Sequence, residues 1–124
     1  MHVEPTDGCW PRPTADNRVK HYYKLVRDRI LEILEQKGLE YVSDIIVNDE
    51  EFAAYLDQKL EEETKEYLVS REPEKLADIL EVIHAIAKTQ GLTFDDLEAL
   101  RMQKREVRGG FDARYFLYWA RGDQ

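Results

Sequence analysis

The chain has 124 residues, of which 43% are apolar and 35% charged, with only six glycines and four prolines. This composition is typical of a single globular domain rich in amphipathic helices, and it excludes disordered and fibrous proteins. The formal net charge of −8 excludes a nucleic-acid partner, because affinity for the phosphate backbone comes mainly from excess lysine and arginine.

The first part of the chain predicts a tail, a helix and a strand. Residues 1–18 show no hydrophobic periodicity and contain three prolines, which predicts a flexible N-terminal tail before a domain spanning residues 19–124. From Tyr23 onward apolar residues recur at helical spacing until Gly38 provides a stop, which predicts the first helix. The run at residues 41–47 is rich in β-branched residues and predicts a short strand.

Two longer helices follow. Asn48 or Asp49 can cap the second helix, with Glu51 in the capping-box position relative to Asn48, and the helix is expected to run to about Val69. Pro73 suits the first turn of the third helix, which ends before Gly91.

The last elements are a helix and an aromatic run. Thr93 and Asp96 open the fourth helix, which ends near Arg108. Residues 115–119 are mostly aromatic and are candidates for pairing with residues 41–47. We therefore predict a mainly all-α fold, a four-helix bundle-like domain with a short two-stranded β ribbon as its only sheet.

The cysteine content and the hydropathy of the chain indicate its cellular compartment. Cys9 is the single cysteine, so no intrachain disulfide can form and a reducing compartment is favoured. No apolar run approaches the roughly 20 residues that cross a bilayer, and the N-terminus lacks the order of a secretory signal. We expect a cytoplasmic protein without membrane contact.

The second predicted helix carries a carboxylate inside its apolar stripe. Glu63 falls in the middle of this stripe and Glu66 flanks it. An ionised carboxylate directed into an apolar interface is costly unless it is paired or bound to a cation. The stripe itself consists of Phe52, Leu56, Leu60 and Tyr67.

The third predicted helix offers acids that could share a cation with Glu63. Glu74, Asp78 and Glu81 lie on one face, and an antiparallel helix pair would bring this face toward Glu63 and Glu66. Crowded carboxylates repel unless their pKa values rise or a divalent cation binds, and hard oxygen ligands suit Mg²⁺ or Mn²⁺. These five acids are the candidate metal ligands.

Simpler interpretations exist for these charges. The glutamates of the second helix could form a solvated face in which Lys59 and Lys65 make salt bridges, although the position of Glu63 argues against this. Cations at helical spacing and a glycine pair are candidates for phosphate binding, with surface solubility and a helix stop as the alternatives. They are Lys24, Arg27, Lys104, Arg108, Gly109 and Gly110. We expect His84 to be a core or interface residue and not a ligand. The aromatic residues at 22–23 and 115–119 are expected to make core or dimer contacts, with stacking on the nucleobase as the alternative for one of them.

Several sequence blocks together resemble one family. The block Glu62-Glu63-x-x-Glu66 is followed by Lys75-Leu76-Ala77-Asp78 and later by Arg108-Gly109-Gly110-Phe111. In this order the chain resembles the all-α nucleoside triphosphate pyrophosphohydrolases, the MazG-like and phosphoribosyl-ATP pyrophosphohydrolase-like group, in its small single-domain branch. The similarity covers about residues 23–117 and implies Mg²⁺-dependent cleavage between the α and β phosphates by a homodimer or homotetramer.

The resemblance also assigns roles. Glu63, Glu66 and Asp78 match metal-binding acids of the family, and Glu62 matches the acid that begins its first motif. The family's second motif is Glu-x-x-Asp, whereas this chain has Lys75 at the position of the first acid. Glu74 and Glu81 are the candidates to supply the lost ligand, and Lys75 is a candidate phosphate contact.

The function expected from this resemblance is hydrolysis of a nucleoside triphosphate, standard, deoxy or otherwise modified, to a monophosphate and pyrophosphate, a house-cleaning reaction. Glu62 or Glu66 is the expected catalytic base that positions water. The alternative is a catalytically weakened helical module that binds a nucleotide, a metal or a protein in the same acidic groove. A third interpretation is a dimerising bundle with neither metal nor ligand.

Overall fold

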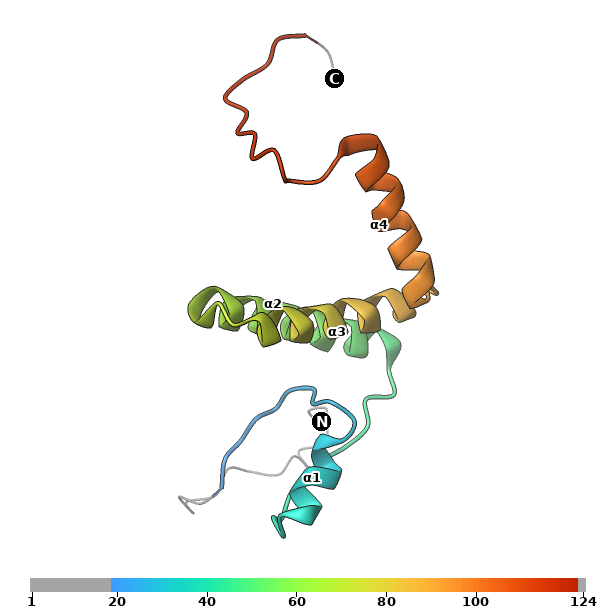
Figure 1. The fold of residues 1–124 in the computed structure, drawn as a ribbon. Helices are drawn as coiled ribbons and strands as arrows, with labels where there is room; N and C mark the ends of the chain where they lie inside the picture. Colours follow the sequence, from blue (N-terminus) through green and yellow to red (C-terminus); the bar gives the residue numbers. More distant parts are fainter. Residues whose placement is uncertain (1–18, 123–124) are drawn as a thin grey trace.

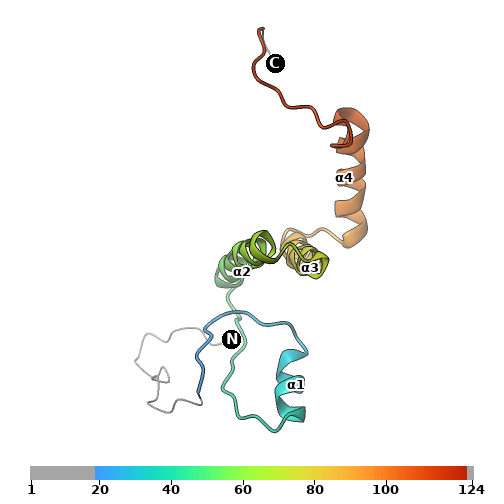
Figure 2. The same ribbon diagram turned by 60° about the vertical axis from the view of Figure 1, so that its left-hand side comes forward.

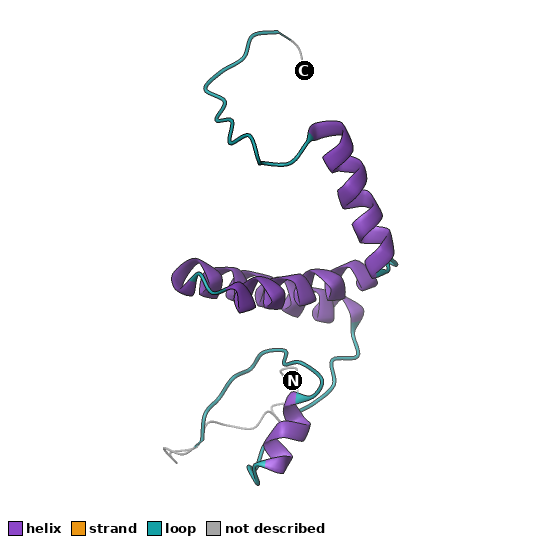
Figure 3. Cartoon of the chain, viewed as in Figure 1, coloured by secondary structure: helices purple, strands orange, loops and turns teal. Residues whose placement is uncertain are grey.

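A computed structural model describes residues 19–122 and shows an all-α chain, with no strand among these residues (Figures 1 and 3). The all-α prediction is therefore confirmed, while the predicted tail at residues 1–18 lies outside the described residues. None of the described helices is both long and apolar enough to span a membrane. The helices are α1 (Ile30–Gln36), α2 (Asp49–Ser70), α3 (Pro73–Thr89) and α4 (Phe94–Arg108).

Local capping fixes where the longer helices begin. The Asn48 side chain accepts a hydrogen bond of 2.9 Å from the Glu51 backbone N–H and so caps α2. Thr93 and Asp96 form a complete capping box at the start of α4, with bonds of 3.1 and 2.9 Å. Pro73 is the first residue of α3, where its missing N–H costs nothing. All three predicted helix starts are confirmed.

The main packing unit is an antiparallel pair formed by α2 and α3, which lie side by side in both ribbon views (Figures 1 and 2). Arg71 adopts a left-handed conformation that ends α2, and its N–H donates to the Tyr67 carbonyl at 2.7 Å. The buried apolar residues of this core are Leu56, Val82 and Ala87.

The other two helices extend from opposite sides of this pair. Helix α4 contacts the end of α3 and projects away from α2, while α1 and the loops around it lie on the other side (Figures 1 and 2). The polypeptide is consequently open, and many apolar side chains outside the α2–α3 interface are exposed to solvent.

Two local predictions are wrong. The first helix begins at Ile30 and not near Tyr23, because the preceding residues form a loop whose Lys24 and Arg27 side chains reach the acidic face of α2 and α3. The predicted β ribbon is absent within the described residues, since residues 41–47 and 115–119 lie on opposite sides of the helix pair and cannot hydrogen-bond to each other.

The small core makes stability sensitive to one side chain. We expect Leu56→Ala, at a residue only 5% exposed, to lower the free energy of unfolding by about 2–5 kcal/mol, because it leaves a cavity between α2 and α3. Urea denaturation followed by circular dichroism measures this change. The control Val69→Ala, on the same helix but 88% exposed, should change stability by less than about 0.5 kcal/mol. Equal effects of the two substitutions would contradict the assignment of the core.

Candidate functional site

Glu63 is a buried acid in the α2–α3 interface. Glu63 lies on the same apolar stripe of α2 as Leu56, and only 9% of its surface is exposed. The Oε2 atom is buried and has no hydrogen-bond partner, while Oε1 lies 3.7 Å from the Lys59 Nζ atom. Burial raises the pKa of Glu63, and the neighbouring carboxylates of Glu66 and Asp78 raise it further. The predicted inward direction of Glu63 is therefore confirmed.

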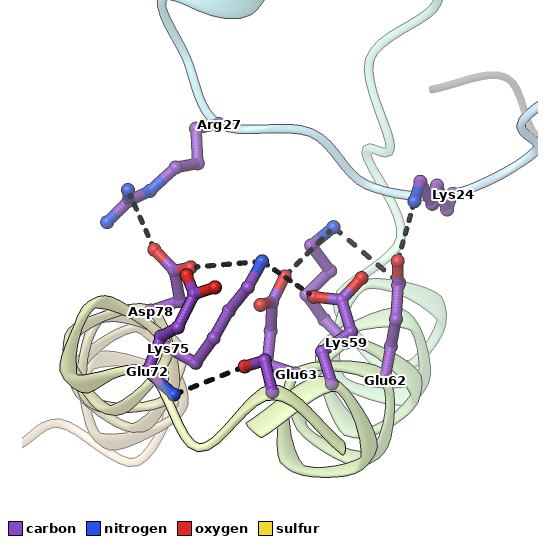
Figure 4. Close-up of polar contacts among 10 residues, drawn as sticks. Lys24, Arg27, Lys59, Glu62, Glu63, Glu72, Lys75 and Asp78 are labelled. Atoms are coloured by element: carbon purple, nitrogen blue, oxygen red, sulfur yellow. Dashed lines mark hydrogen bonds and ion pairs between the residues drawn. The ribbon is translucent and has the colours of Figure 1, made fainter. Parts of the chain in front are cut away.

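Three further acids share this face and form, with Glu63, what we call the acidic cluster. Its members are Glu62, Glu63 and Glu66 from α2 and Asp78 from α3. In Figure 4 the labelled side chains of Glu62, Glu63 and Asp78 point toward the same side of the helix pair. The antiparallel packing of α2 and α3 thus brings together acids that are 12 to 16 residues apart in the sequence.

Lys75 joins the two helices within the cluster. Its Nζ atom lies 3.4 Å from Glu66 Oε2 and 4.0 Å from Asp78 Oδ2 (Figure 4). The hydrogen bond to Glu66 raises the pKa of Lys75, so the side chain carries a positive charge among the carboxylates. The ammonium group therefore lies between carboxylates of α2 and α3.

The extended segment before α1 supplies two more cations. Lys24 Nζ lies 2.6 Å from Glu62 Oε1, and Arg27 Nη1 lies 3.4 Å from Asp78 Oδ1 (Figure 4). The hydrogen bond from Lys24 lowers the pKa of Glu62, and the same bond raises the pKa of Lys24. Arg27 also reaches Glu81, with 3.8 Å between Nη2 and Oε1. Both predicted cations thus lie at the acidic cluster.

Lys59 belongs to the same group of cations, although the sequence suggested only a surface salt bridge. Its Nζ atom lies 3.6 Å from Glu62 and 3.7 Å from Glu63, and its side chain is largely buried. The signal was present in the sequence, because Lys59 is four residues before Glu63 on the same face. Only the burial of that face shows that Lys59 is part of the site.

The remaining candidates lie farther from the cluster. Glu81 reaches it only through Arg27, and Glu74 is exposed and forms none of the ion pairs found in the described part of the chain. Four others lie at the C-terminal end of α4, which projects away from α2. These four are Lys104, Arg108, Gly109 and Gly110.

The glycine pair also has a structural role. The Gly109 N–H donates to the Arg105 carbonyl at 2.7 Å, and the positive φ of 84° at Gly109 ends α4. A Cβ on Gly110 would meet the flexible Arg105 guanidinium. Gly109 therefore acts as a helix stop within one chain, and its N–H is already used.

The acidic cluster has the donor chemistry that Mg²⁺ prefers, because it offers carboxylate oxygens from two helices and an unpartnered buried oxygen on Glu63. In residues 19–122, however, no three acidic, histidine or cysteine side chains lie close enough together to form a ready-made metal site. Lys59 and Lys75 lie between the carboxylates instead. A divalent cation would fit these ligands by replacing an ammonium group.

His84 lies away from the cluster at the corner between α3 and α4. Its ring centroid is 3.8 Å from that of Phe94, and the residue is half-buried. This packing agrees with the expectation that His84 is a core histidine.

Comparisons with protein-family models, with curated proteins and with solved structures found no match for this chain. The functional assignment therefore depends on the residues and geometry of the acidic cluster.

The buried charge of Glu63 predicts a pH effect in metal-free buffer. The folded-state pKa of Glu63 lies above the ordinary value of 4.5. Below pH 4.5 the carboxyl is protonated in both the folded and the unfolded chain, so it costs no stability. As the pH rises through the folded-state pKa, the buried carboxyl becomes charged and the folded chain loses stability. We expect Glu63→Gln to be more stable than the natural chain at pH 7, with the difference disappearing as the pH falls toward 4.5. Urea denaturation across this pH range measures the effect.

The matched control is Glu61→Gln, which removes an exposed acid that pairs with Lys65 at 3.0 Å. Its effect on stability should be small at every pH, because exposed ion pairs contribute little. A natural chain that is more stable than Glu63→Gln at pH 7 would contradict the prediction, because the neighbouring cations would then fully compensate the buried charge of Glu63.

Proposed function

We propose that this chain is a Mg²⁺-dependent nucleoside triphosphate pyrophosphohydrolase that also accepts Mn²⁺. The observation that carries the proposal is the meeting of four carboxylates from α2 and α3, one of them the buried Glu63. Three cations each lie within 3.4 Å of one of these carboxylates. Acids that hold a metal and cations that bind phosphate are the two requirements of phosphoryl chemistry.

Glu63, Glu66 and Asp78 are the residues that would hold the metal, with Glu81 at the edge of the site. Glu63 offers an oxygen that has no other partner, and Glu66 and Asp78 would exchange the Lys75 ammonium for the metal. When bound, Mg²⁺ supplies positive charge that neutralises the phosphates during cleavage.

The proposed reaction is attack by water on the α-phosphorus, which forms a new P–O bond and breaks the bond to the departing pyrophosphate. A carboxylate accepts the proton of the attacking water. The ion pair with Lys24 lowers the pKa of Glu62 and so makes it a weaker base. This supports Glu66 as the catalytic base and Glu62 as the acid that holds Lys24 beside the substrate.

The phosphate-binding cations are Lys24, Arg27 and Lys75. Each is now paired with a carboxylate of the cluster, so substrate binding would exchange these ion pairs for contacts with phosphate oxygens. The segment that carries Lys24 and Arg27 precedes α1 and lies outside the α2–α3 pair.

The wider assignment follows the sequence resemblance. We propose that the chain belongs to the MazG-like branch, acts in the cytoplasm and assembles as a homodimer or homotetramer. The exposed apolar residues outside the α2–α3 interface support self-association. In a single copy Lys104 and Arg108 are remote from the cluster, so they could contact substrate only across a subunit boundary.

The activity itself is directly testable. We expect the purified chain to release pyrophosphate from at least one member of a panel of standard, deoxy and modified nucleoside triphosphates, only when Mg²⁺ or Mn²⁺ is present. Asp78→Asn should reduce the rate by roughly 100-fold or more, because it removes a carboxylate that would hold the metal ion at the reacting phosphates.

The control for Asp78→Asn is Glu61→Gln, which lies on the opposite, exposed side of α2 and should keep the activity within about twofold. Absence of pyrophosphate from every substrate with both metals would overturn the proposed hydrolysis.

A second candidate function is supported by the position of Lys75. Its ammonium occupies the space between Glu66 and Asp78, so the cluster is partly neutralised without a metal. A chain in which this ion pair persists would be a weakened enzyme or a sensor that binds a nucleotide, a metal or a partner protein in the acidic groove.

Substituting Lys75→Glu separates the two candidates. It removes the competing ammonium and adds a carboxylate, so we expect the Mg²⁺ concentration that gives half-maximal thermal stabilisation to fall at least about tenfold. Lys75→Ala should have an intermediate effect, because it only removes the competitor. Hydrolysis that rises strongly in Lys75→Glu favours the weakened enzyme, whereas hydrolysis that falls favours Lys75 as a phosphate contact in an active one.

A further inference from the structure

Two segments of the described chain, residues 19–122, expose most of their apolar side chains to solvent. The first, which we call the arm, is residues 115–119, and its side chains are between 73% and 95% exposed. No backbone–backbone hydrogen bond involves these residues within the described chain. The ring contact between Phe116 and Tyr118, with centroids 5.2 Å apart, lies inside the arm itself. Among the described residues, the arm is therefore an aromatic segment that is largely exposed to solvent.

The second segment, which we call the receiver, is residues 41–47 together with an adjacent pocket. Val42, Ile45 and Val47 are between 78% and 87% exposed. The pocket has a volume of about 250 Å³, and most of the side chains around it are apolar. The apolar ones are Leu25, Val26, Leu31, Ile45, Ile46 and Phe52.

The two segments have complementary properties. The receiver is rich in β-branched residues and the arm in aromatic residues, and both kinds are favoured in strands. The receiver also offers a pocket, while the arm offers rings. Arg114 and Arg121 flank the arm, whereas Glu40 and Asp44 lie in or next to the receiver. The charges at the two segments are therefore opposite in sign.

The arm cannot reach the receiver of its own chain in this arrangement. The arm follows α4 on one side of the α2–α3 pair, and the receiver lies between α1 and α2 on the other side (Figures 1 and 2). The helix pair separates them. A second copy of the chain carries the same two segments and has no such obstacle.

We propose that two copies of this chain exchange arms: residues 115–119 of each copy pair as a strand with residues 41–47 of the other and place an aromatic ring in its pocket. One exchange creates the identical contact twice, as a two-fold symmetric dimer requires. A strand presents alternate side chains to one face, so each arm buries about two of its rings. At roughly 150–250 Å² for each ring, two arms bury about 600–1,000 Å², and with a comparable area on the covered receivers the total exceeds the roughly 1,000 Å² that a specific interface needs. This inference does not rest on the proposed hydrolysis.

The fluorescence of Trp119 can report the exchange. The chain has two tryptophans, so Trp10→Phe leaves Trp119 as the only one. In this background we expect a blue-shifted emission at micromolar concentration that moves to the red on dilution. An emission that stays blue-shifted and does not change with concentration would mean that the arm packs within its own chain, and an emission that is red throughout would mean that no copy receives the arm. Either result overturns the proposal.

A complementation experiment identifies the two contacting segments. The receiver variant Val42→Asp/Ile45→Asp keeps Trp119, and we expect its half-maximal emission shift to need at least about thirtyfold higher concentration, because central apolar contacts are lost. The arm variant Phe116→Ser/Leu117→Ser/Trp119→Ser contains no tryptophan in the same background. Its receiver is intact, so adding it should restore the blue shift of the receiver variant.

Three controls complete the design. Val107→Asp, at an exposed apolar residue on α4 outside both segments, should leave the concentration dependence unchanged. An arm variant that also carries the receiver substitutions should fail to restore the blue shift. Circular dichroism of every variant should show unchanged helix content, because neither segment is helical. No restoration by the arm variant with helix content intact would overturn the arm exchange, while pyrophosphate release would test the proposed function separately.

Discussion

Glu63 occupies a position in the α2–α3 interface that an apolar residue would fill at lower cost, and its carboxylate loses hydration there. Lysine side chains of both helices lie close to this buried acid and its neighbours. Lys59 lies beside Glu63 on the same helix, and Lys75 connects the neighbouring acids of the two helices. A charge can be buried only when opposite charges compensate its lost hydration. The acidic cluster and its cations therefore form one coupled unit.

The same requirement explains the course of the chain before α1. Helical periodicity continues backward to Tyr23, yet the segment is extended and contributes Lys24 and Arg27 to acids on α2 and α3. The attraction of the acidic face for these cations competes with local helix propensity, which amounts to only a few tenths of a kcal/mol per residue. Under the proposed function, a metal ion and a polyphosphate would replace these internal ion pairs.

The open arrangement of the helices connects the site to assembly. A chain with three buried apolar residues among those described has a small core, and its exposed aromatic arm and receiver would add to that core in a pair of copies. Because α1 and the receiver adjoin the segment that carries Arg27, association through the receiver would also restrain one wall of the acidic cluster. Assembly and phosphate chemistry would then depend on the same short region of the chain.

The sequence by itself determined the helix starts at Asn48, Pro73 and Thr93 and the inward direction of Glu63, because capping and helical periodicity act within a few residues. Only the tertiary structure decided which cations meet the acids. Lys59 proved to be part of the cluster, whereas the basic end of α4 lies away from it, since the direction of α4 depends on a corner that periodicity does not encode. Strand propensity likewise identified two extended segments but not their partner, because β pairing depends on contacts between residues that are distant in the sequence or in another copy.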